Sequence, residues 1–119
     1  MRLLIFGLMF LHQTAHAITG NELHDLLQSE DTYKSMQGMS YLQGYSDAES
    51  FFKYFESSSA QEQNRKPNLH FFSCPPENVT VGQAKDVVKK FLEDNPAKRN
   101  INAAILMRRA FTEAWPCSD

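Results

Sequence analysis

Residues 80–95 constrain the fold more than any other segment, because they have the pattern of an amphipathic helix with both ends marked. Thr80 and Gln83 have the spacing of a capping box, in which two side chains satisfy backbone N–H groups at a helix start. Apolar side chains then recur at the three- and four-residue steps of one helix face: Ala84, Val87, Val88, Phe91 and Leu92. Asn95-Pro96 follows, and the residue before a proline is disfavoured in helical backbone. The segment therefore predicts a helix with one apolar face.

Three other segments show the same periodicity. Thr19 and Glu22 form a second capping-box pattern, and the helix after it ends near Ser29 with one apolar face made of Leu23, Leu26 and Leu27. A long helix is expected from about Thr32 to Phe55, with an apolar stripe of Tyr41, Tyr45, Ala48, Phe52 and Phe55. A last helix is expected over residues 101–114, with a buried face of Ala103, Leu106, Met107, Ala110, Phe111 and Ala114. Since strand-like alternation of useful length does not occur, we predict an all-α fold, a compact bundle of four to five helices.

The N-terminus has, in order, the three parts of a secretory signal peptide. Arg2 supplies a positive charge, residues 3–11 form an apolar run, and Ala15-His16-Ala17 has the small-x-small pattern that signal peptidase requires. The apolar run is too short to span a bilayer. We therefore expect residues 1–17 to be a signal peptide and residues 18–119 to be a single helical domain. The alternative is a buried N-terminal helix.

Export would allow the two cysteines, Cys74 and Cys117, to form a disulfide, and two cysteines allow only one pairing. The bridge would join the entry of the third predicted helix to the exit of the fourth. The rival interpretation, two thiols as metal ligands, is weak, because His24 and His70 show no metal-ligand spacing. We expect no metal and no other cofactor.

The composition and motifs argue against several classes of function. A formal net charge of −2 disfavours nucleic-acid binding, which favours basic domains. Neither His24 nor His70 is paired in sequence with a nucleophile, and both are interpreted as polar surface residues. Neighbouring carboxylates such as Glu93-Asp94 point about 100° apart on a helix, so they do not converge as an acid–base pair. We therefore expect a protein that is not an enzyme.

Residues 56–68 have almost no apolar content and are interpreted as an exposed loop with room for a short helical turn. Loops on rigid scaffolds are where binding residues concentrate. The candidates for contact with a partner are Gln61, Glu62, Gln63, Asn64, Arg65 and Lys66. A second choice is the turn at residues 94–100, with Lys98 and Arg99. The alternative for both is solvated surface without a partner.

The aromatic residues of the long helix cover more than one of its faces. Tyr45 and Phe52 would suffice for a core, so Phe51 and Tyr54 point elsewhere and form a candidate protein–protein surface. The alternative is a second helix of the same chain packed over them. Gly44 is interpreted either as the site of a tight helix crossing or as a tolerated weak position.

Four sequence blocks, in order, match a known family. Residues 41–48, YLQGYSDA, match an aromatic-x-x-Gly-aromatic-x-Asp-Ala signature, and residues 74–83, CPPENVTVGQ, match a Cys-x-Pro-x-x-Val-Thr-x-x-Gln block. Residues 87–96 and 110–117 complete the pattern. The chain resembles the Rap/Tai family, the immunity proteins against amidase effectors of type VI secretion. Many members have additional cysteines near the first helix and just before the Gly-aromatic motif. This chain has Met39 and Ser40 there, so that second bridge is missing.

The resemblance implies a helical domain, often a homodimer, in the periplasm. Its partner would be a peptidoglycan amidase with a papain-like Cys–His site, delivered by neighbouring cells. The immunity protein would bind that enzyme and block its substrate groove, without a reaction of its own. The polar loop at residues 56–68 is long enough to enter such a groove.

Two other functions remain open from the sequence. Small exported helical proteins with one disulfide also include acid-stress chaperones, which expose apolar surface at low pH. An immunity protein should instead form a tight complex with one amidase and should not suppress aggregation of unrelated proteins. An enzyme would reveal itself by new amide cleavage in peptidoglycan.

Overall fold

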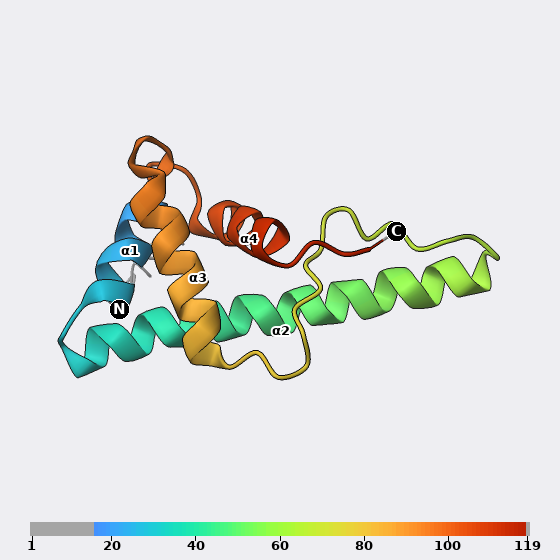
Figure 1. The fold of residues 1–119 in the computed structure, drawn as a ribbon, viewed down its shortest axis with the longest axis horizontal. Helices are drawn as coiled ribbons and strands as arrows, with labels where there is room; N and C mark the ends of the chain where they lie inside the picture. Colours follow the sequence, from blue (N-terminus) through green and yellow to red (C-terminus); the bar gives the residue numbers. More distant parts are fainter. Residues whose placement is uncertain (1–15, 119) are drawn as a thin grey trace, which may run out of the picture.

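The computed structural model describes residues 16–118, which form four α-helices and one short 3₁₀ helix and confirm the predicted all-α class. The helices are α1 (Gly20–Gln28), α2 (Thr32–Glu62), α3 (Val81–Asp94), η1 (Pro96–Lys98, the 3₁₀ helix) and α4 (Ala103–Ala114). In Figure 1, α1, α3 and α4 gather near the first half of α2, and the second half of α2 extends beyond them. None of the described helices is long and apolar enough to cross a membrane. Residues 1–15 of the predicted signal peptide lie outside the described part of the chain.

One face of each α-helix contributes to the core. Its buried side chains are Leu23, Leu27, Leu42, Ala84, Val88, Leu92, Ala103, Leu106, Met107, Ala110 and Phe111. The predicted apolar faces of α1, α3 and α4 are confirmed, except that Ala114 is exposed. Full burial of a side chain such as Leu or Met stabilises a fold by roughly 1.5–3 kcal/mol. We call α1, α3, α4 and residues 32–48 of α2 the body, because apolar burial holds these parts together.

Both predicted capping boxes are present. The Glu22 N–H donates to Thr19 Oγ1 at 3.3 Å, and the Thr19 N–H donates to Glu22 Oε2 at 2.6 Å. At the start of α3 the corresponding distances between Gln83 and Thr80 are 3.2 and 2.9 Å. Thr19 also faces Asn102 in an isolated antiparallel bridge, so the start of α1 is joined to the start of α4.

A tight helix crossing occurs at Gly38 rather than at Gly44. A Cβ atom on Gly38 would lie 3.0 Å from Leu27 Cδ2 and 3.1 Å from Leu26 Cβ, which is closer than most Cβ contacts. Gly38 therefore lets α1 approach α2. Gly44 is exposed, and a Cβ atom there would meet no atom within 4 Å. Its interpretation as a crossing within the chain is wrong.

The long helix continues beyond its predicted end at Phe55 as far as Glu62, so the interpretation of residues 56–62 as loop is wrong. Nothing in residues 56–62 breaks a helix, and Ala60 is fully buried. Gln63 is the C-cap after Glu62, and Asn64 has a φ of 50°, the left-handed backbone that often follows a helix. The Arg65 N–H donates to the Ala60 carbonyl at 2.9 Å and the Asn64 N–H to the Gln61 carbonyl at 3.1 Å, the pattern of a Schellman motif.

The predicted disulfide joins Cys74 to Cys117, with an S–S distance of 2.08 Å. It links the segment before α3 to the segment after α4, as expected from the order of the helices. The Cys74 N–H also donates to the Trp115 carbonyl at 2.8 Å, and Ser73 faces Pro116 in an isolated bridge. The chain entering α3 is thus fixed to the end of α4.

Candidate partner-binding site

The second half of α2 and the segment after it form a projecting unit. We call residues 49–73 the arm: α2 carries the chain outward from Glu49 to Glu62, and the chain then returns alongside α2 toward the disulfide (Figure 1). The outer end of the arm, residues 61–68, is called the tip. The arm lies beyond the body, so its outer surfaces are open to a partner.

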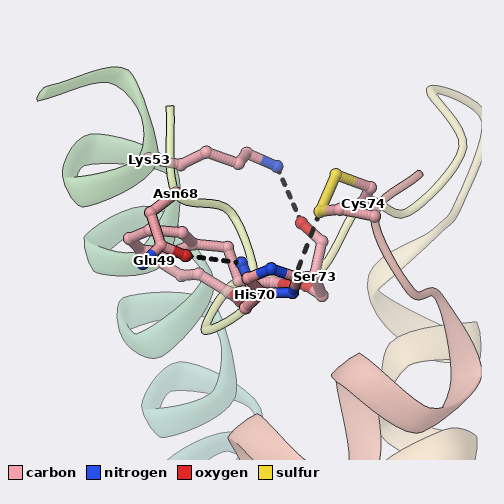
Figure 2. The surroundings of a disulfide bond; sticks show 8 residues. Glu49, Lys53, Asn68, His70, Ser73 and Cys74 are labelled. Carbon is pink, nitrogen blue, oxygen red and sulfur yellow. Dashed lines mark hydrogen bonds between the residues drawn. A yellow bond between two sulfur atoms is a disulfide. The ribbon is translucent and has the colours of Figure 1, made fainter. Parts of the chain in front are cut away.

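Glu49 and Lys53, one turn apart on α2, hold the returning segment at Ser73. The Ser73 N–H donates to Glu49 Oε1 at 2.6 Å, and the Ser73 hydroxyl donates to Glu49 Oε2 at 3.1 Å. Lys53 Nζ donates to the Ser73 carbonyl at 2.8 Å, as Figure 2 shows. Ser73 is only 3% exposed, and these bonds replace the water that it loses on burial.

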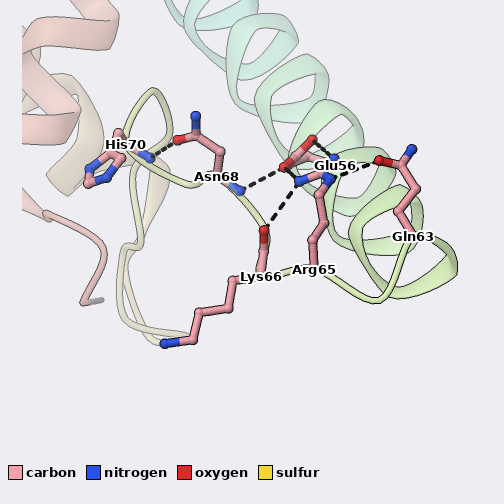
Figure 3. A network of polar contacts seen from close by, with 6 residues as sticks. All are labelled: Glu56, Gln63, Arg65, Lys66, Asn68 and His70. Atoms are coloured by element: carbon pink, nitrogen blue, oxygen red, sulfur yellow. Dashed lines mark hydrogen bonds and ion pairs between the residues drawn. The ribbon is translucent and has the colours of Figure 1, made fainter.

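Glu56 closes the arm near its tip, seven residues after Glu49 and therefore on the same side of α2. The guanidinium of Arg65 donates to both carboxylate oxygens of Glu56, at 2.7 and 3.2 Å. The Asn68 N–H donates to Glu56 Oε1 at 2.6 Å (Figure 3). We call Glu56, Arg65 and the Asn68 N–H the clasp. Bidentate charged hydrogen bonds of this kind fix geometry as well as distance.

The clasp favours the charged forms of both of its side chains. Hydrogen bonds from Arg65, and then from the Asn68 N–H, lower the pKa of Glu56 from 4.5 to about 2. The carboxylate of Glu56 raises the pKa of Arg65 in turn. The clasp is therefore fully ionised at neutral pH.

The polar contacts along the arm were missed from the sequence. Glu49, Lys53 and Glu56 follow one another at steps of four and three, so they share one side of α2. That spacing was the available signal. It pointed to a charged helix side, but not to the backbone groups far along the chain that this side binds.

The six predicted binding residues lie together at the tip, but they do not all belong to a loop. Gln61 and Glu62 belong to the last turn of α2, Gln63 is its C-cap, and Asn64 carries the left-handed backbone that ends it. Arg65 is held by the clasp, and its Nε donates to Gln63 Oε1 at 3.0 Å. Four of these six residues have exposed side chains that make no hydrogen bond or ion pair within the described chain: Gln61, Glu62, Asn64 and Lys66.

Five aromatic side chains of the arm are exposed, and that of Phe72 is half-buried. Tyr45 packs on Phe111 with 5.9 Å between ring centroids, as expected for a core residue. Phe52 was expected to be buried beside it, but this is wrong, because the returning segment covers only the side of α2 that carries Glu49 and Glu56. The exposed fractions are 62% for Phe51, 58% for Phe52, 72% for Tyr54, 61% for Phe55 and 62% for Phe71. Within the described residues, no second helix covers these side chains.

An apolar groove lies between the arm and the body. Phe52, Phe55 and Phe71 line it together with Arg108 of α4. The guanidinium carbon of Arg108 lies 5.5 Å from the centroid of the Phe71 ring, within the range of a cation–π contact. This contact and the disulfide connect the returning segment to α4.

The other sequence candidates do not form a site. His24 is buried, with its Nδ1 3.8 Å from Asp25, so its interpretation as a surface residue is wrong. In the turn at residues 94–100, Lys98 Nζ donates to Asn95 Oδ1, and Arg99 Nε donates to the Leu92 carbonyl at the end of α3. Within residues 16–118 no group of three or more His, Cys, Asp or Glu side chains could hold a metal.

A polar tip held by the clasp, on an arm with exposed aromatic side chains, is suited to binding another protein. A sequence model of the Rap1a immunity proteins matches residues 19–117, which include every helix of the body and the whole arm. Curated proteins and solved structures yielded no match. Since the family match covers most of the chain, this protein belongs to the Rap1a family of immunity proteins.

Proposed function

We propose that this protein protects a cell by binding a peptidoglycan amidase effector of type VI secretion and blocking its substrate groove. The observation that carries the proposal is the projecting tip on a chain of the Rap1a immunity family. The protein would have no reaction of its own and would act by occupying the groove.

The tip has the properties of a segment that enters a groove. It lies at the end of the arm, and the clasp holds its backbone before any partner arrives. Order that exists before binding reduces the entropy lost on association. The side chains free to contact the enzyme are Gln61, Glu62, Asn64 and Lys66, a polar set suited to hydrogen bonds in a cleft that normally holds a peptide.

The site of action would be the periplasm. Residues 1–17 would be removed as a signal peptide, and residues 18–119 would act as one domain. The disulfide supports this location, since such bonds persist in oxidising compartments. The peptidoglycan substrate of the amidase lies in the same compartment.

The protein would act as a homodimer. The family resemblance of the sequence implies this state, and the exposed aromatic side chains on α2 support it, because a monomer seldom leaves such a surface uncovered.

The test is inhibition of a cysteine amidase encoded beside this protein. We expect one equivalent of protein per amidase to abolish release of peptides from peptidoglycan. The double variant Glu62→Arg with Lys66→Glu should raise the inhibitory concentration at least tenfold without unfolding, because both side chains are free at the tip. Lys85→Glu with Asp86→Arg, on α3, is the matched control, because it also reverses one charge of each sign and leaves the net charge unchanged. Equal inhibition by the wild-type protein, the tip variant and the control variant would exclude the tip as the surface that contacts the amidase.

A chaperone would behave differently in the same samples. It would suppress aggregation of unrelated proteins at acid pH and would show no fixed ratio to the amidase. That result, together with undiminished peptidoglycan cleavage, would contradict the immunity function.

A further inference from the structure

A cavity of about 220 Å³ lies where the body meets the base of the arm, and the proposed function does not use it. Side chains of α2 between residues 42 and 53 line it, together with side chains of residues 73–84 and with Phe111 and Trp115. The segment between the disulfide and α3 passes beside α2 here (Figure 1). Pockets that enclose a drug-sized ligand usually have about 300–1,000 Å³, so this smaller cavity has room for a single side chain.

Three charged side chains line the cavity, and two of them are already bound. Glu49 accepts from the Ser73 N–H and hydroxyl, and Lys53 donates to the Ser73 carbonyl (Figure 2). Asp47 is exposed and makes no hydrogen bond or ion pair within residues 16–118. The cavity therefore presents the negative charge of Asp47 without a partner from the described chain.

Two polar side chains lie in line with Asp47 on α2. Gln43 is four residues before it and Ser50 three residues after it, so the three share one side of the helix. All three line the cavity and are exposed, and the Gln43 amide and the Ser50 hydroxyl also have no hydrogen-bond partner in the described chain. Carboxylate, amide and hydroxyl oxygens accept hydrogen bonds. This acceptor row suits a group that has several donors.

The rest of the lining is mainly apolar. The turn before α3 contributes Pro75, Pro76 and Val79, and the buried side chains of Leu42 and Phe111 also line the cavity. Apolar surface beside a carboxylate is complementary to a side chain with an aliphatic stem and a cationic end. A wholly apolar group would leave Asp47 unpaired.

Arginine fits this cavity better than lysine does. Its guanidinium has five N–H donors in one plane, can bind a carboxylate through two parallel hydrogen bonds, and stacks on aromatic rings. The acceptor row supplies the oxygens, and Trp115 supplies an aromatic ring. The ammonium of lysine is more strongly hydrated and has fewer donors.

We propose that this cavity receives an arginine side chain of the amidase, with the guanidinium on Asp47 and the stem against the apolar lining. The inference rests on the proposed function and adds a second contact to that of the tip. Asp47 and Glu62 are fifteen residues apart on α2, about 22 Å along the helix axis. A small domain is about 30 Å across, so one enzyme can contact the cavity and the tip together.

The first test uses the protein alone, with N-acetyl-arginine methylamide as the probe. In proton–nitrogen correlation NMR, we expect shifts confined to residues 42–53, residues 73–84 and the Trp115 indole. A Kd in roughly the millimolar range is expected for a ligand of this size. The absence of these shifts at concentrations tenfold above that range would overturn the proposal.

Matched controls isolate the charge in this test. N-acetyl-citrulline methylamide has nearly the same shape without the charge, and it should bind at least tenfold more weakly. The arginine probe should lose affinity equally for Asp47→Asn and should bind Asp86→Asn as it binds wild type, since Asp86 is an exposed aspartate on α3 that also lacks a partner in the described chain. Equal binding of the arginine and citrulline probes would overturn the proposal.

The second test measures affinity for the amidase. Asp47→Arg should raise the Kd at least tenfold, because it places a like charge against the incoming arginine, and the circular dichroism should be unchanged because residue 47 is exposed. Asp86→Arg is the control and should bind like wild type. When exposed arginines of the amidase are replaced by glutamate one at a time, Asp47→Arg should restore the affinity lost at one of them. Wild-type affinity of Asp47→Arg would overturn the proposal.

The two tests separate this inference from the function on which it rests. An amidase that the wild-type protein does not bind would overturn the proposed function and the amidase as the source of the arginine, while the first test would still decide whether the cavity binds arginine. An amidase inhibited equally by wild type and Asp47→Arg would overturn the role of the cavity and leave the immunity function standing.

Discussion

The body and the arm of this protein are held together by different forces. In the body, the side chains of four helices bury one another, and the core residues are almost fully enclosed. In the arm, three side chains of α2 bind the backbone and one arginine of the returning segment, and a disulfide fixes its base. Five of the six aromatic side chains of the arm remain exposed to solvent.

The difference explains how a small protein can present a long, shaped surface. Apolar burial is non-directional and draws groups together into a compact mass. Directional hydrogen bonds can hold a chain in place at a distance from that mass. The arm can thus keep its apolar surface for a partner, because its own stability does not depend on burying that surface.

The largest effect should come from a cavity in the body. Leu106→Ala removes a side chain that is 1% exposed, and it should lower the free energy of unfolding by about 2–5 kcal/mol. Phe52→Ala, in the arm, should change it by no more than about 0.5 kcal/mol in the monomer. Urea denaturation of both variants at low protein concentration measures the contrast. Comparable losses would mean that the arm is part of the core.

The second largest loss of stability should come from removing the disulfide at the base of the arm. Cys74→Ser should lower the free energy of unfolding by about 2–4 kcal/mol in oxidising buffer, because the bridge restricts the unfolded chain. In strong reductant the variant and the wild-type protein should melt together. Equal melting temperatures in oxidising buffer would contradict a stabilising bridge.

The clasp should stabilise the arm against local opening and should have little effect on the stability of the body. Glu56→Gln should speed hydrogen exchange at residues 57–68, while exchange in α1, α3 and α4 stays unchanged. Glu62→Gln, at the same end of α2 but without a partner, is the control. Faster exchange throughout the chain would mean that the arm and the body unfold as one unit.

The clasp also predicts a pH dependence. The pKa of Glu56 is lowered to about 2 from an ordinary value of 4.5, so its stabilising effect is complete above about pH 4.5 and is lost as the pH falls toward 2. The difference in arm protection between wild type and Glu56→Gln should shrink over that range. A difference that stays constant down to pH 2 would exclude ionised Glu56 as its source.

The smallest expected changes in stability come from replacing each of two glycines of α2 by alanine. Gly44→Ala should stabilise the monomer by about 0.5–1 kcal/mol, because alanine favours helix and has free space there. Gly38→Ala should destabilise it, because the new methyl group would press on Leu26 and Leu27 of α1. Thermal melts at low concentration measure both, and a shift of the same sign would contradict the different roles assigned to them.

Much of the body could be read from local sequence. The capping boxes at Thr19 and Thr80, the stop at Asn95-Pro96 and the apolar spacing in α1, α3 and α4 all act between residues a few positions apart. The pairing of Cys74 with Cys117 followed because no other cysteine was present. These features were predicted correctly because each depends on near neighbours in the sequence or on a single possible pairing.

The arm was predicted less well. The end of α2 was placed too early, because residues 56–62 lack the apolar periodicity on which the prediction relied, although their backbone is free to be helical. The loop that remains, residues 63–68, was smaller than expected. Of the six predicted binding residues, Arg65 serves the clasp, and its partner Glu56 could be identified only once the chain had turned back.

The sequence by itself determined where helices start, which faces of α1, α3 and α4 are apolar, and which cysteines pair, since each depends on near neighbours or on a single possible choice. Only the tertiary structure decided that Phe52 and Phe55 are exposed, that Glu49 and Glu56 bind the returning chain, and that Gly38 rather than Gly44 meets another helix. The physical reason is that burial and directional contacts depend on which distant segment arrives at a surface, and helical periodicity contains no information about that segment.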